Sequence, residues 1–168
     1  MGSVRMGEMA VSRNGGEELF ALGLGSCIGL ALLDTSAGVS GLAHIVLPAS
    51  SERDNERGKY ADRAVPELIS RMQAAGAVPR RMEAVLVGGA RMFAVGELDI
   101  GARNEAAVRA QLQATRVAVR ATATGGNRGR TIRVAAGTCA VTVKEAGGET
   151  STLFEGAAAR RQPIGARA

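Results

Sequence analysis

The stretch LFALGLGSCIGLALLDTSAGVSGLAHIVL (residues 19–47) decides how we expect this chain to fold. It contains three apolar runs, at residues 19–24, 28–33 and 39–47, each of the length of a β-strand. A tight glycine-rich segment separates the first two runs, and the polar turn at 34–38 separates the last two. The pattern predicts three successive strands. The middle run is continuously apolar, which favours a buried strand, with a short helix as the alternative.

Further strands are expected on both sides of this stretch. Alternating apolar residues at 4–11 predict a first strand that ends before the turn Asn14-Gly15-Gly16. The buried-strand pattern recurs at 82–87, and a strand follows at 115–121. After a glycine-rich loop at 125–130, the runs at 131–135 and 140–144 predict a hairpin. In the remaining tail only residues 151–154 have the pattern of an ordered segment.

Two segments carry the pattern of a helix. Between residues 65 and 72 the apolar side chains recur at helical spacing on one face. Pro66 lacks an N–H, so we expect regular hydrogen bonding to begin near Ala64 and the helix to end at Gly76. A second helix is expected from Asn104, a good N-cap residue, with Glu105 favourably placed in its first turn.

Strands and helices therefore interleave, and this predicts an α/β or α+β fold with a mixed sheet. The chain has 168 residues, which is the length of one domain. We expect one domain over residues 1–150, followed at 151–168 by a short terminal strand and a flexible tail.

Composition excludes several classes of function. Aromatic residues make up only 2% of the chain, too few for a platform that stacks single-stranded nucleic acid. Two cysteines and one histidine cannot build a four-ligand zinc site of the usual type, and we expect neither a metal nor a cofactor. The apolar runs are too short to span a bilayer, and no segment resembles a signal peptide. We therefore expect a cytoplasmic protein.

Charge is distributed unevenly along the chain. Residues 1–100 carry ten basic and twelve acidic side chains, whereas residues 101–168 carry eleven basic and four acidic ones. Nineteen of the 21 basic residues are arginines, and they are dispersed along the sequence. A dispersed pattern indicates a solvated surface, not the clustered basic patch of a nucleic-acid-binding protein, so we expect no nucleic-acid partner.

Cys27 and His44 are the strongest candidates for chemistry. The thiol follows the tight turn Gly25-Ser26, and the imidazole lies on the next strand, across the turn at 34–38. Neighbouring strands lie about 4.8 Å apart, so this spacing allows the two side chains to meet. An adjacent imidazolium would favour the thiolate, and the N–H groups of the Gly25-Ser26 turn could hold an oxyanion. The reaction class would be acyl transfer through a thioester.

Structural interpretations remain open for these residues. A lone cysteine in an apolar run is more often a small buried hydrophobe, and a lone histidine on a strand is more often packed and hydrogen-bonded. Cys139 keeps that structural interpretation, because no second histidine exists to activate it. The glycines at 23–29 do not have the spacing of a dinucleotide-binding fingerprint, and those at 125–129 lack the Lys-Ser/Thr pair of a P-loop.

Six motifs follow one another in order along this chain. They are Gly23-Leu24-Gly25-Ser26-Cys27, Ala43-His44-Ile45-Val46-Leu47-Pro48, Lys59-Tyr60-Ala61-Asp62, Gly88-Gly89-Ala90-Arg91-Met92-Phe93, Ile100-Gly101-Ala102-Arg103-Asn104, and Gly125-Gly126-Asn127 with Gly129-Arg130. Together they resemble the CheD family of chemoreceptor glutamine deamidases, and the resemblance runs from about Val4 to Lys144.

This resemblance implies a layered α/β sandwich similar to a toxin deamidase domain. It implies hydrolysis of glutamine side chains on methyl-accepting chemotaxis receptors, with Cys27 as nucleophile and His44 as general base. It also implies binding to a CheC-type phosphatase, for which Phe93 is a candidate contact, although a core position for Phe93 is an equal alternative.

One departure stands out: the family commonly has a threonine, thought to orient the histidine, where this chain has Ala21. Either activity is reduced, or another acceptor such as a backbone carbonyl replaces the hydroxyl. A catalytically weakened adaptor that binds the receptor and the phosphatase is therefore the alternative function, and a related cysteine hydrolase is a weaker one.

Overall fold

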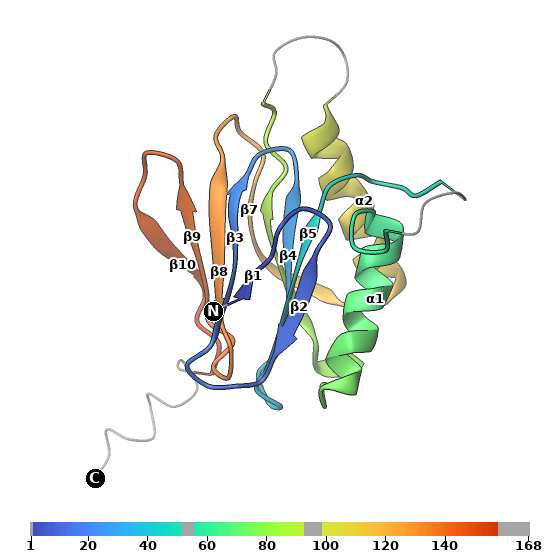
Figure 1. The fold of residues 1–168 in the computed structure, drawn as a ribbon, viewed down its shortest axis with the longest axis vertical. Helices are drawn as coiled ribbons and strands as arrows, with labels where there is room; N and C mark the ends of the chain where they lie inside the picture. The colour runs from blue at the N-terminus through green and yellow to red at the C-terminus, as the bar shows by residue number, and fades with distance from the viewer. Residues whose placement is uncertain (1, 52–55, 93–98, 158–168) are drawn as a thin grey trace.

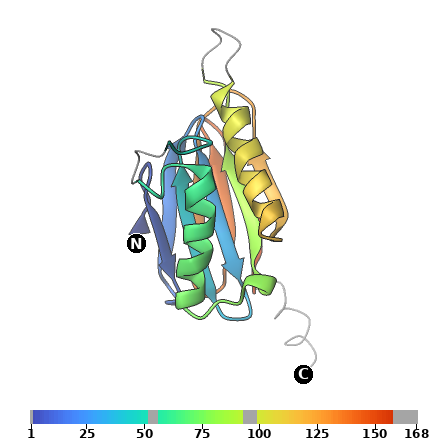
Figure 2. The same cartoon turned by 90° about the vertical axis from the view of Figure 1, so that its right-hand side faces the viewer.

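A computed structural model describes residues 2–51, 56–92 and 99–157 of the chain. Two five-stranded sheets pack face to face, and two helices cover the outer face of one of them (Figures 1 and 2). The elements are β1 (Gly2–Ser3), β2 (Met9–Ser12), β3 (Glu18–Leu24), β4 (Ile28–Asp34), β5 (Val39–Ile45), α1 (Ala61–Ala74), the 3₁₀ turn η1 (Pro79–Arg81), β6 (Glu83–Gly88), α2 (Ile100–Ala114), β7 (Ala118–Thr124), β8 (Arg130–Ala135), β9 (Val141–Glu145) and β10 (Thr150–Phe154). This three-layer α+β arrangement confirms the predicted fold class.

The sheets differ in how they are covered. The first has the order β1-β3-β8-β9-β10, and one of its faces is open to solvent. The second has the order β2-β5-β4-β6-β7 and lies between the first sheet and the helices. Strands β4 and β5 are buried along their whole length because they form the centre of this middle layer. That is why the residues of the 28–33 run are apolar on both faces.

Two hydrophobic cores result from this layering. Alternate residues of β4 point to opposite faces, so Leu30 packs under the helices while Ala31 packs between the sheets. Helix α1 contributes Val65, Leu68 and Met72 to the helical core, as their spacing predicts. The molecule therefore has one core on each side of the β4–β5 pair.

The strand expected at 4–11 is wrong in detail. Residues 2–3 pair with β3 in the first sheet, whereas residues 9–12 pair with β5 in the second. The chain crosses between the layers near Gly7, whose φ of +79° is a left-handed conformation that favours glycine. The expected strand thus overlaps β2 alone, and β1 lies before it in the other sheet.

Both helix starts differ from expectation. Helix α1 begins at Ala61, so Pro66 lies beyond the first turn and leaves the Asp62 carbonyl without its helical N–H donor. Helix α2 begins at Ile100, and its N-cap is Asp99, whose carboxylate accepts the N–H of Ala102 at 2.9 Å. Asn104 is therefore not a cap. The other expected elements are confirmed, with β7 shifted by three residues at both ends.

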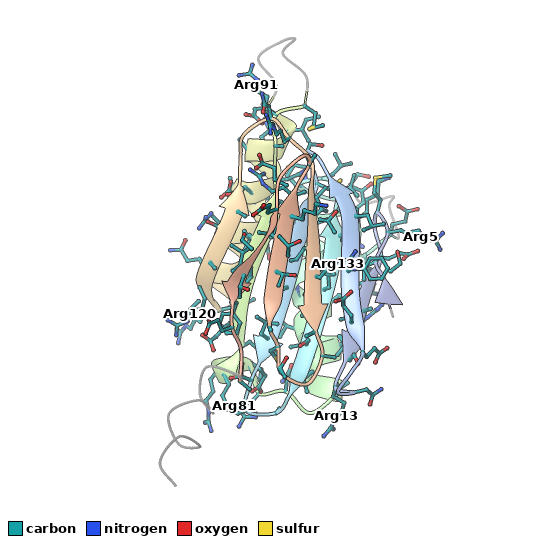
Figure 3. All side chains as sticks on the ribbon, turned by 90° about the vertical axis from the view of Figure 1, so that its left-hand side faces the viewer. Arg5, Arg13, Arg81, Arg91, Arg120 and Arg133 are labelled. Atoms are coloured by element: carbon teal, nitrogen blue, oxygen red, sulfur yellow. The ribbon has the colours of Figure 1, made fainter. Side chains whose placement is uncertain are left out.

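Most of the arginine side chains that Figure 3 labels lie apart from one another, whereas Arg81 and Arg120 line the same pocket. Several of them are held by acidic partners, such as Arg120 by Glu83 at 2.6 Å and Arg133 by Glu18 at 2.8 Å. The basic side chains are therefore spread over the surface except at that pocket, which Arg80 and Arg116 also line. Within the described residues, no helix is long and apolar enough to cross a membrane.

Candidate active site

The register of β4 and β5 places Cys27 and His44 on the same face of the middle sheet. His44 pairs with Gly29, and Cys27 lies two residues before Gly29, so both side chains point into the layer between the two sheets. Diagonal neighbours of this kind lie about 7–8 Å apart at the backbone, within reach of a long side chain. The described hydrogen bonds include none between the thiol and the imidazole. The fold thus places the thiol and the imidazole near each other on one face, and no hydrogen bond between them is among those described.

The end of β6 holds the turn that carries Cys27. The N–H of Gly89 donates to the Cys27 carbonyl at 2.8 Å, and the N–H of Ala90 donates to the Gly25 carbonyl at 2.8 Å. These bonds occupy the carbonyl groups of the turn. By contrast, no backbone carbonyl of a described residue accepts from the N–H groups of residues 25–27. N–H groups that have no backbone acceptor among the described residues and lie beside a sulfur atom can hold an oxyanion, although the N–H of Cys27 also interacts with its own sulfur.

The N-terminal segment holds His44. The ring atom Nδ1 lies 3.1 Å from the Val4 carbonyl oxygen, which can only accept a hydrogen bond. The backbone of His44 is fixed as well, since its N–H donates to Glu8 at 3.0 Å and its carbonyl accepts from Gly7 at 2.9 Å. In the neutral ring the proton is therefore on Nδ1, and Nε2 carries the free lone pair. This is the tautomer that a general base at Nε2 needs.

Burial keeps both candidate groups neutral. Burial raises the pKa of the Cys27 thiol, and its own backbone N–H offsets this only partly. Burial also lowers the pKa of His44, against smaller opposing effects of the Val4 carbonyl and the Glu8 charge. Both shifts work against a thiolate–imidazolium pair in the free protein. The favoured resting state is a neutral thiol beside a neutral imidazole.

Asn104 belongs to this site, although its sequence context predicts only a helix cap. It lies inside α2 with its side chain fully buried. Its amide Nδ2 donates to the Ser26 carbonyl at 2.9 Å and to the Val46 carbonyl at 2.8 Å. Its Oδ1 has no hydrogen-bond partner among the described residues, which costs about 1–3 kcal/mol in a buried position. The N-cap expectation failed because Asp99, five residues earlier, starts the helix.

A small pocket opens beside the turn. It has a volume of about 70 Å³, and its lining includes Ser26, Met92, Asp99 and Ile100. Cys27 itself is 8% exposed and does not line this pocket, but its neighbour Ser26 does. Met92 and Ile100 are exposed apolar side chains at its rim. Phe93, the candidate partner contact, lies outside the described residues.

The other singled-out residues have structural positions. Ala21 is buried on β3 and faces the same layer between the sheets as Cys27. Cys139 is buried at the far end of that layer, where its sulfur accepts a hydrogen bond from the Ser40 hydroxyl at 3.2 Å. Among the described residues, no group of three or more histidine, cysteine, aspartate or glutamate side chains could hold a metal ion.

Comparison with known proteins identifies relatives of the chain. A family described as "CheD chemotactic sensory transduction" matches residues 46–145, a range that begins after Cys27 and His44. The "Chemoreceptor glutamine deamidase CheD" of Thermotoga maritima is 39% identical over 145 residues, which cover 86% of this chain and 92% of that protein.

Two further relatives carry the name "Probable chemoreceptor glutamine deamidase CheD". The protein of Moorella thermoacetica is 46% identical over 68% of this chain and 72% of its own length. The protein of Symbiobacterium thermophilum is 40% identical over 79% of this chain and 84% of its own length. With a layered α+β fold and similarity of this extent, the chain belongs to the CheD family.

Proposed function

We propose that this protein is a deamidase that hydrolyses glutamine side chains on the cytoplasmic helices of chemoreceptors. The names of its relatives supply the substrate class. The observation that carries the proposal is the placement of Cys27 on a turn with free N–H groups, diagonal to the only histidine of the chain. No other described part of the chain offers a thiol, a base and oxyanion donors together.

The first half of the reaction forms a thioester. Sγ of Cys27 attacks the side-chain carbonyl carbon of glutamine while Nε2 of His44 takes the thiol proton. The negative charge that develops on the amide oxygen is held by the N–H groups of the Gly25-Ser26-Cys27 turn. The imidazolium then gives its proton to the amide nitrogen, the C–N bond breaks, and ammonia leaves.

The second half of the reaction uses water. His44 takes a proton from a water molecule, and the resulting hydroxide attacks the thioester carbonyl. The C–S bond breaks, the thiol regains its proton from the imidazolium, and glutamate is released. Because the resting groups are neutral, proton transfer accompanies attack, and no preformed thiolate is required.

The Val4 carbonyl supports this role of His44. The chain has Ala21 where the family resemblance implies a threonine hydroxyl, so another acceptor must orient the ring. The contact from Val4 to Nδ1 selects the tautomer with a basic Nε2. A main-chain carbonyl and a threonine hydroxyl are both uncharged acceptors, so the Val4 contact supports the alternative in which another acceptor replaces the hydroxyl.

The proposal is tested with a cytoplasmic fragment of a chemoreceptor. We expect the wild-type protein to release ammonia and to raise the mass of particular glutamine-containing peptides by the amide-to-acid change. Cys27→Ala should lower this rate by about 10⁴-fold or more, because the nucleophile is lost. Cys139→Ala is the matched control, since it removes the other buried thiol, and it should keep nearly the full rate. Full activity of Cys27→Ala, or no deamidation by the wild type, would contradict the proposal.

A non-catalytic adaptor is the second candidate. Ala21 and the raised pKa of Cys27 favour it, because both weaken the nucleophile. Such an adaptor would bind receptor helices and a CheC-type phosphatase in the cytoplasm without changing the receptor. Binding of the receptor fragment by wild type and Cys27→Ala alike, with no ammonia from either, would favour the adaptor.

Ala21→Thr sharpens the choice between these candidates. The side chain at position 21 faces the layer that contains His44. We expect the threonine variant to deamidate faster if the protein is a weakened enzyme, because the hydroxyl adds a second acceptor for the Nδ1 proton and leaves Nε2 free to act as the base. An adaptor would gain no activity from the substitution.

A further inference from the structure

The two strands of the β4–β5 hairpin separate at the end of the ladder that lies farthest from the turn joining them. Ile28 and Ile45 form the last pair of the β4–β5 ladder at this open end. On one side, the carbonyl of Cys27 turns to the N–H of Gly89 at the end of β6. On the other side, the N–H of Val46 turns to the Lys59 carbonyl at 2.9 Å. The segments that carry Cys27 and follow His44 are thus drawn toward different neighbours.

Asn104 joins the two separating segments. One hydrogen of its amide binds the carbonyl of Ser26, the residue before Cys27, and the other binds the carbonyl of Val46, two residues after His44. Both acceptors are carbonyl groups, so only the NH₂ end of the amide can face them. The side chain is fully buried, so no competition with bulk solvent loosens either bond. One rigid amide therefore fixes how far the two segments stand apart.

We infer that Asn104 is a positioning residue that sets the separation of Cys27 and His44 by bridging the Ser26 and Val46 carbonyls. It does not touch the reacting atoms, and it acts through the backbone on each side of the pair. This inference deepens the proposed deamidase function and rests on it for its catalytic consequence. Its structural consequence, the geometry of the thiol and the ring, is independent of any substrate.

The expected effect is on rate, not on binding. A displacement of about 1 Å between reacting groups can cost about 10²-fold in rate. We expect Asn104→Ala to lower kcat for glutamine deamidation by about that factor while KM changes by less than about threefold. Leu112→Ala is the matched control, because Leu112 is also buried on α2 but packs in the helical core away from the two carbonyls.

Two measurements that need no substrate accompany the kinetics. The rate of Cys27 alkylation against pH reports the protonation of the thiol, and the ring ¹⁵N shifts of His44 report its tautomer. The second signal is unambiguous because the chain has a single histidine. Asn104→Ala should change both, and Leu112→Ala should change neither. If Asn104→Ala does not fold, Asn104→Ser serves in its place, since one hydroxyl can donate to only one of the two carbonyls.

The outcomes separate the two proposals. An inactive wild type whose alkylation profile and His44 shifts still respond to Asn104→Ala would overturn the deamidase function and support the positioning role. An active wild type whose kcat, thiol profile and ring shifts are unchanged in Asn104→Ala and Asn104→Ser would overturn the positioning role alone. Equal responses of Asn104→Ala and Leu112→Ala would also overturn it, because general loosening of α2 would then explain them.

Discussion

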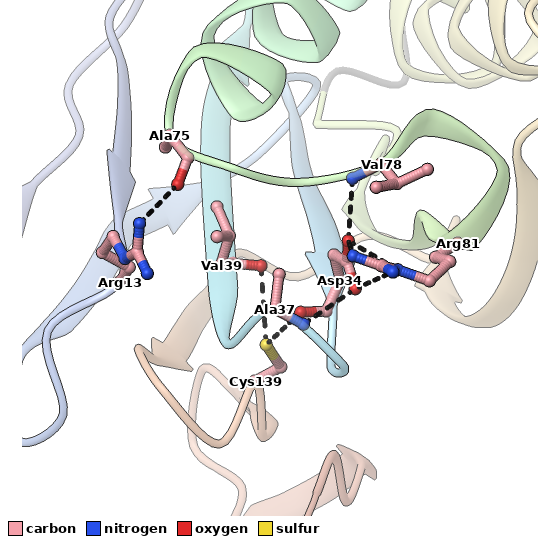
Figure 4. A network of polar contacts seen from close by, with 8 residues as sticks. All are labelled: Arg13, Asp34, Ala37, Val39, Ala75, Val78, Arg81 and Cys139. Atoms are coloured by element: carbon pink, nitrogen blue, oxygen red, sulfur yellow. Dashed lines mark hydrogen bonds and ion pairs between the residues drawn. The ribbon is translucent and has the colours of Figure 1, made fainter.

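A buried cysteine lies at each end of the β4–β5 hairpin, and the surroundings of the two sulfur atoms differ. The open end is the pair Ile28–Ile45, and the closed end is the turn that joins Asp34 to Val39. At the open end, Cys27 lies on a turn whose N–H groups have no backbone partner among the described residues. At the closed end, the sulfur of Cys139 accepts a hydrogen bond from the Ser40 hydroxyl. The same sulfur contacts the Val39 carbonyl at 3.5 Å (Figure 4). Burial raises the pKa of both thiols, so burial and pKa alone do not distinguish them. What distinguishes them is the polar groups left free beside each sulfur.

The closed end is built for stability. The Asp34 carboxylate accepts hydrogen bonds from the N–H of Ala37, the N–H of Val78 and the Arg81 guanidinium (Figure 4). These bonds tie the β4–β5 turn to the segment that follows α1. Every strong acceptor in this group is used within the fold. The N–H groups at the open end of the hairpin thus lack backbone acceptors among the described residues, whereas the Asp34 carboxylate at the closed end accepts several hydrogen bonds.

The largest expected effect is the contrast in reactivity between the two thiols. We expect iodoacetamide to modify Cys27 at least about 10²-fold faster than Cys139 in the folded protein, because Cys139 is inaccessible until the sandwich opens. A time course of peptide masses measures both rates in one sample. In denaturant the rates should become similar. Equal rates in the native protein would remove the distinction between the two ends.

Asp34→Ala should destabilise the closed end of the hairpin and leave the geometry of the open end unchanged. We expect the free energy of unfolding to fall by about 3 kcal/mol, since the buried carboxylate leaves Arg81 and two backbone N–H groups without it. Chemical denaturation measures this loss. The deamidation rate per folded molecule should stay unchanged, and a loss of that rate would show that the two ends are coupled.

The effect of Asp34 should depend on pH. Burial alone would raise its pKa, but the N–H of Val78, the Arg81 side chain and the N–H of Ala37 outweigh burial, and the pKa lies below its ordinary value. A lowered carboxylate pKa stabilises the fold above the ordinary value of about 4, and this stabilisation is lost as pH falls through the lowered pKa. The stability difference between wild type and Asp34→Ala should therefore shrink in acid below about pH 4.

Gly88→Ala and Gly125→Ala form a matched pair at the open end. Both glycines have positive φ, +111° and +82°, so alanine is strained at either position. A Cβ at Gly88 would also overlap the Cys27 carbonyl oxygen, whereas one at Gly125 meets open space. We expect Gly88→Ala to lose about 2 kcal/mol more stability than Gly125→Ala. Gly88→Ala should also change the alkylation rate of Cys27, and an unchanged rate would contradict a rigid turn.

The smallest effect concerns His44. Because burial lowers its pKa, NMR titration should give a value below the ordinary 6.5. The unfolded chain then binds a proton at higher pH than the folded one, so stability should fall as pH drops below about 6.5 and level off below the folded pKa. His44→Gln should lack this dependence. A titration above 6.5 would indicate a charged partner and would restore the ion-pair mechanism.

Local pattern was sufficient for the strands and for the catalytic candidates. The apolar runs at 28–33 and 39–47 and the turn between them predicted an antiparallel pair, and the register that results puts Cys27 and His44 on one face. The pattern failed where its meaning depends on distant residues. The alternating run at 4–11 contains only part of β2, because the chain turns between the sheets within it. Asn104 is a residue type suited to an N-cap, but Asp99 caps the helix.

The sequence by itself determined the mixture of strands and helices, the buried hairpin and the positions of thiol and imidazole along it, because strand periodicity and short turns are encoded by neighbouring residues. The layered arrangement was expected only from the resemblance to the CheD family. Only the tertiary structure decided what holds that pair. The Val4 carbonyl reaches the His44 ring across 40 residues, and the Asn104 amide reaches Val46 across 58 and Ser26 across 78. Every residue has a main-chain carbonyl, so the sequence does not mark which one will accept a hydrogen bond from His44. The sequence likewise does not distinguish Asn104 from other asparagines, because its role depends on the packing that places its amide between two carbonyls.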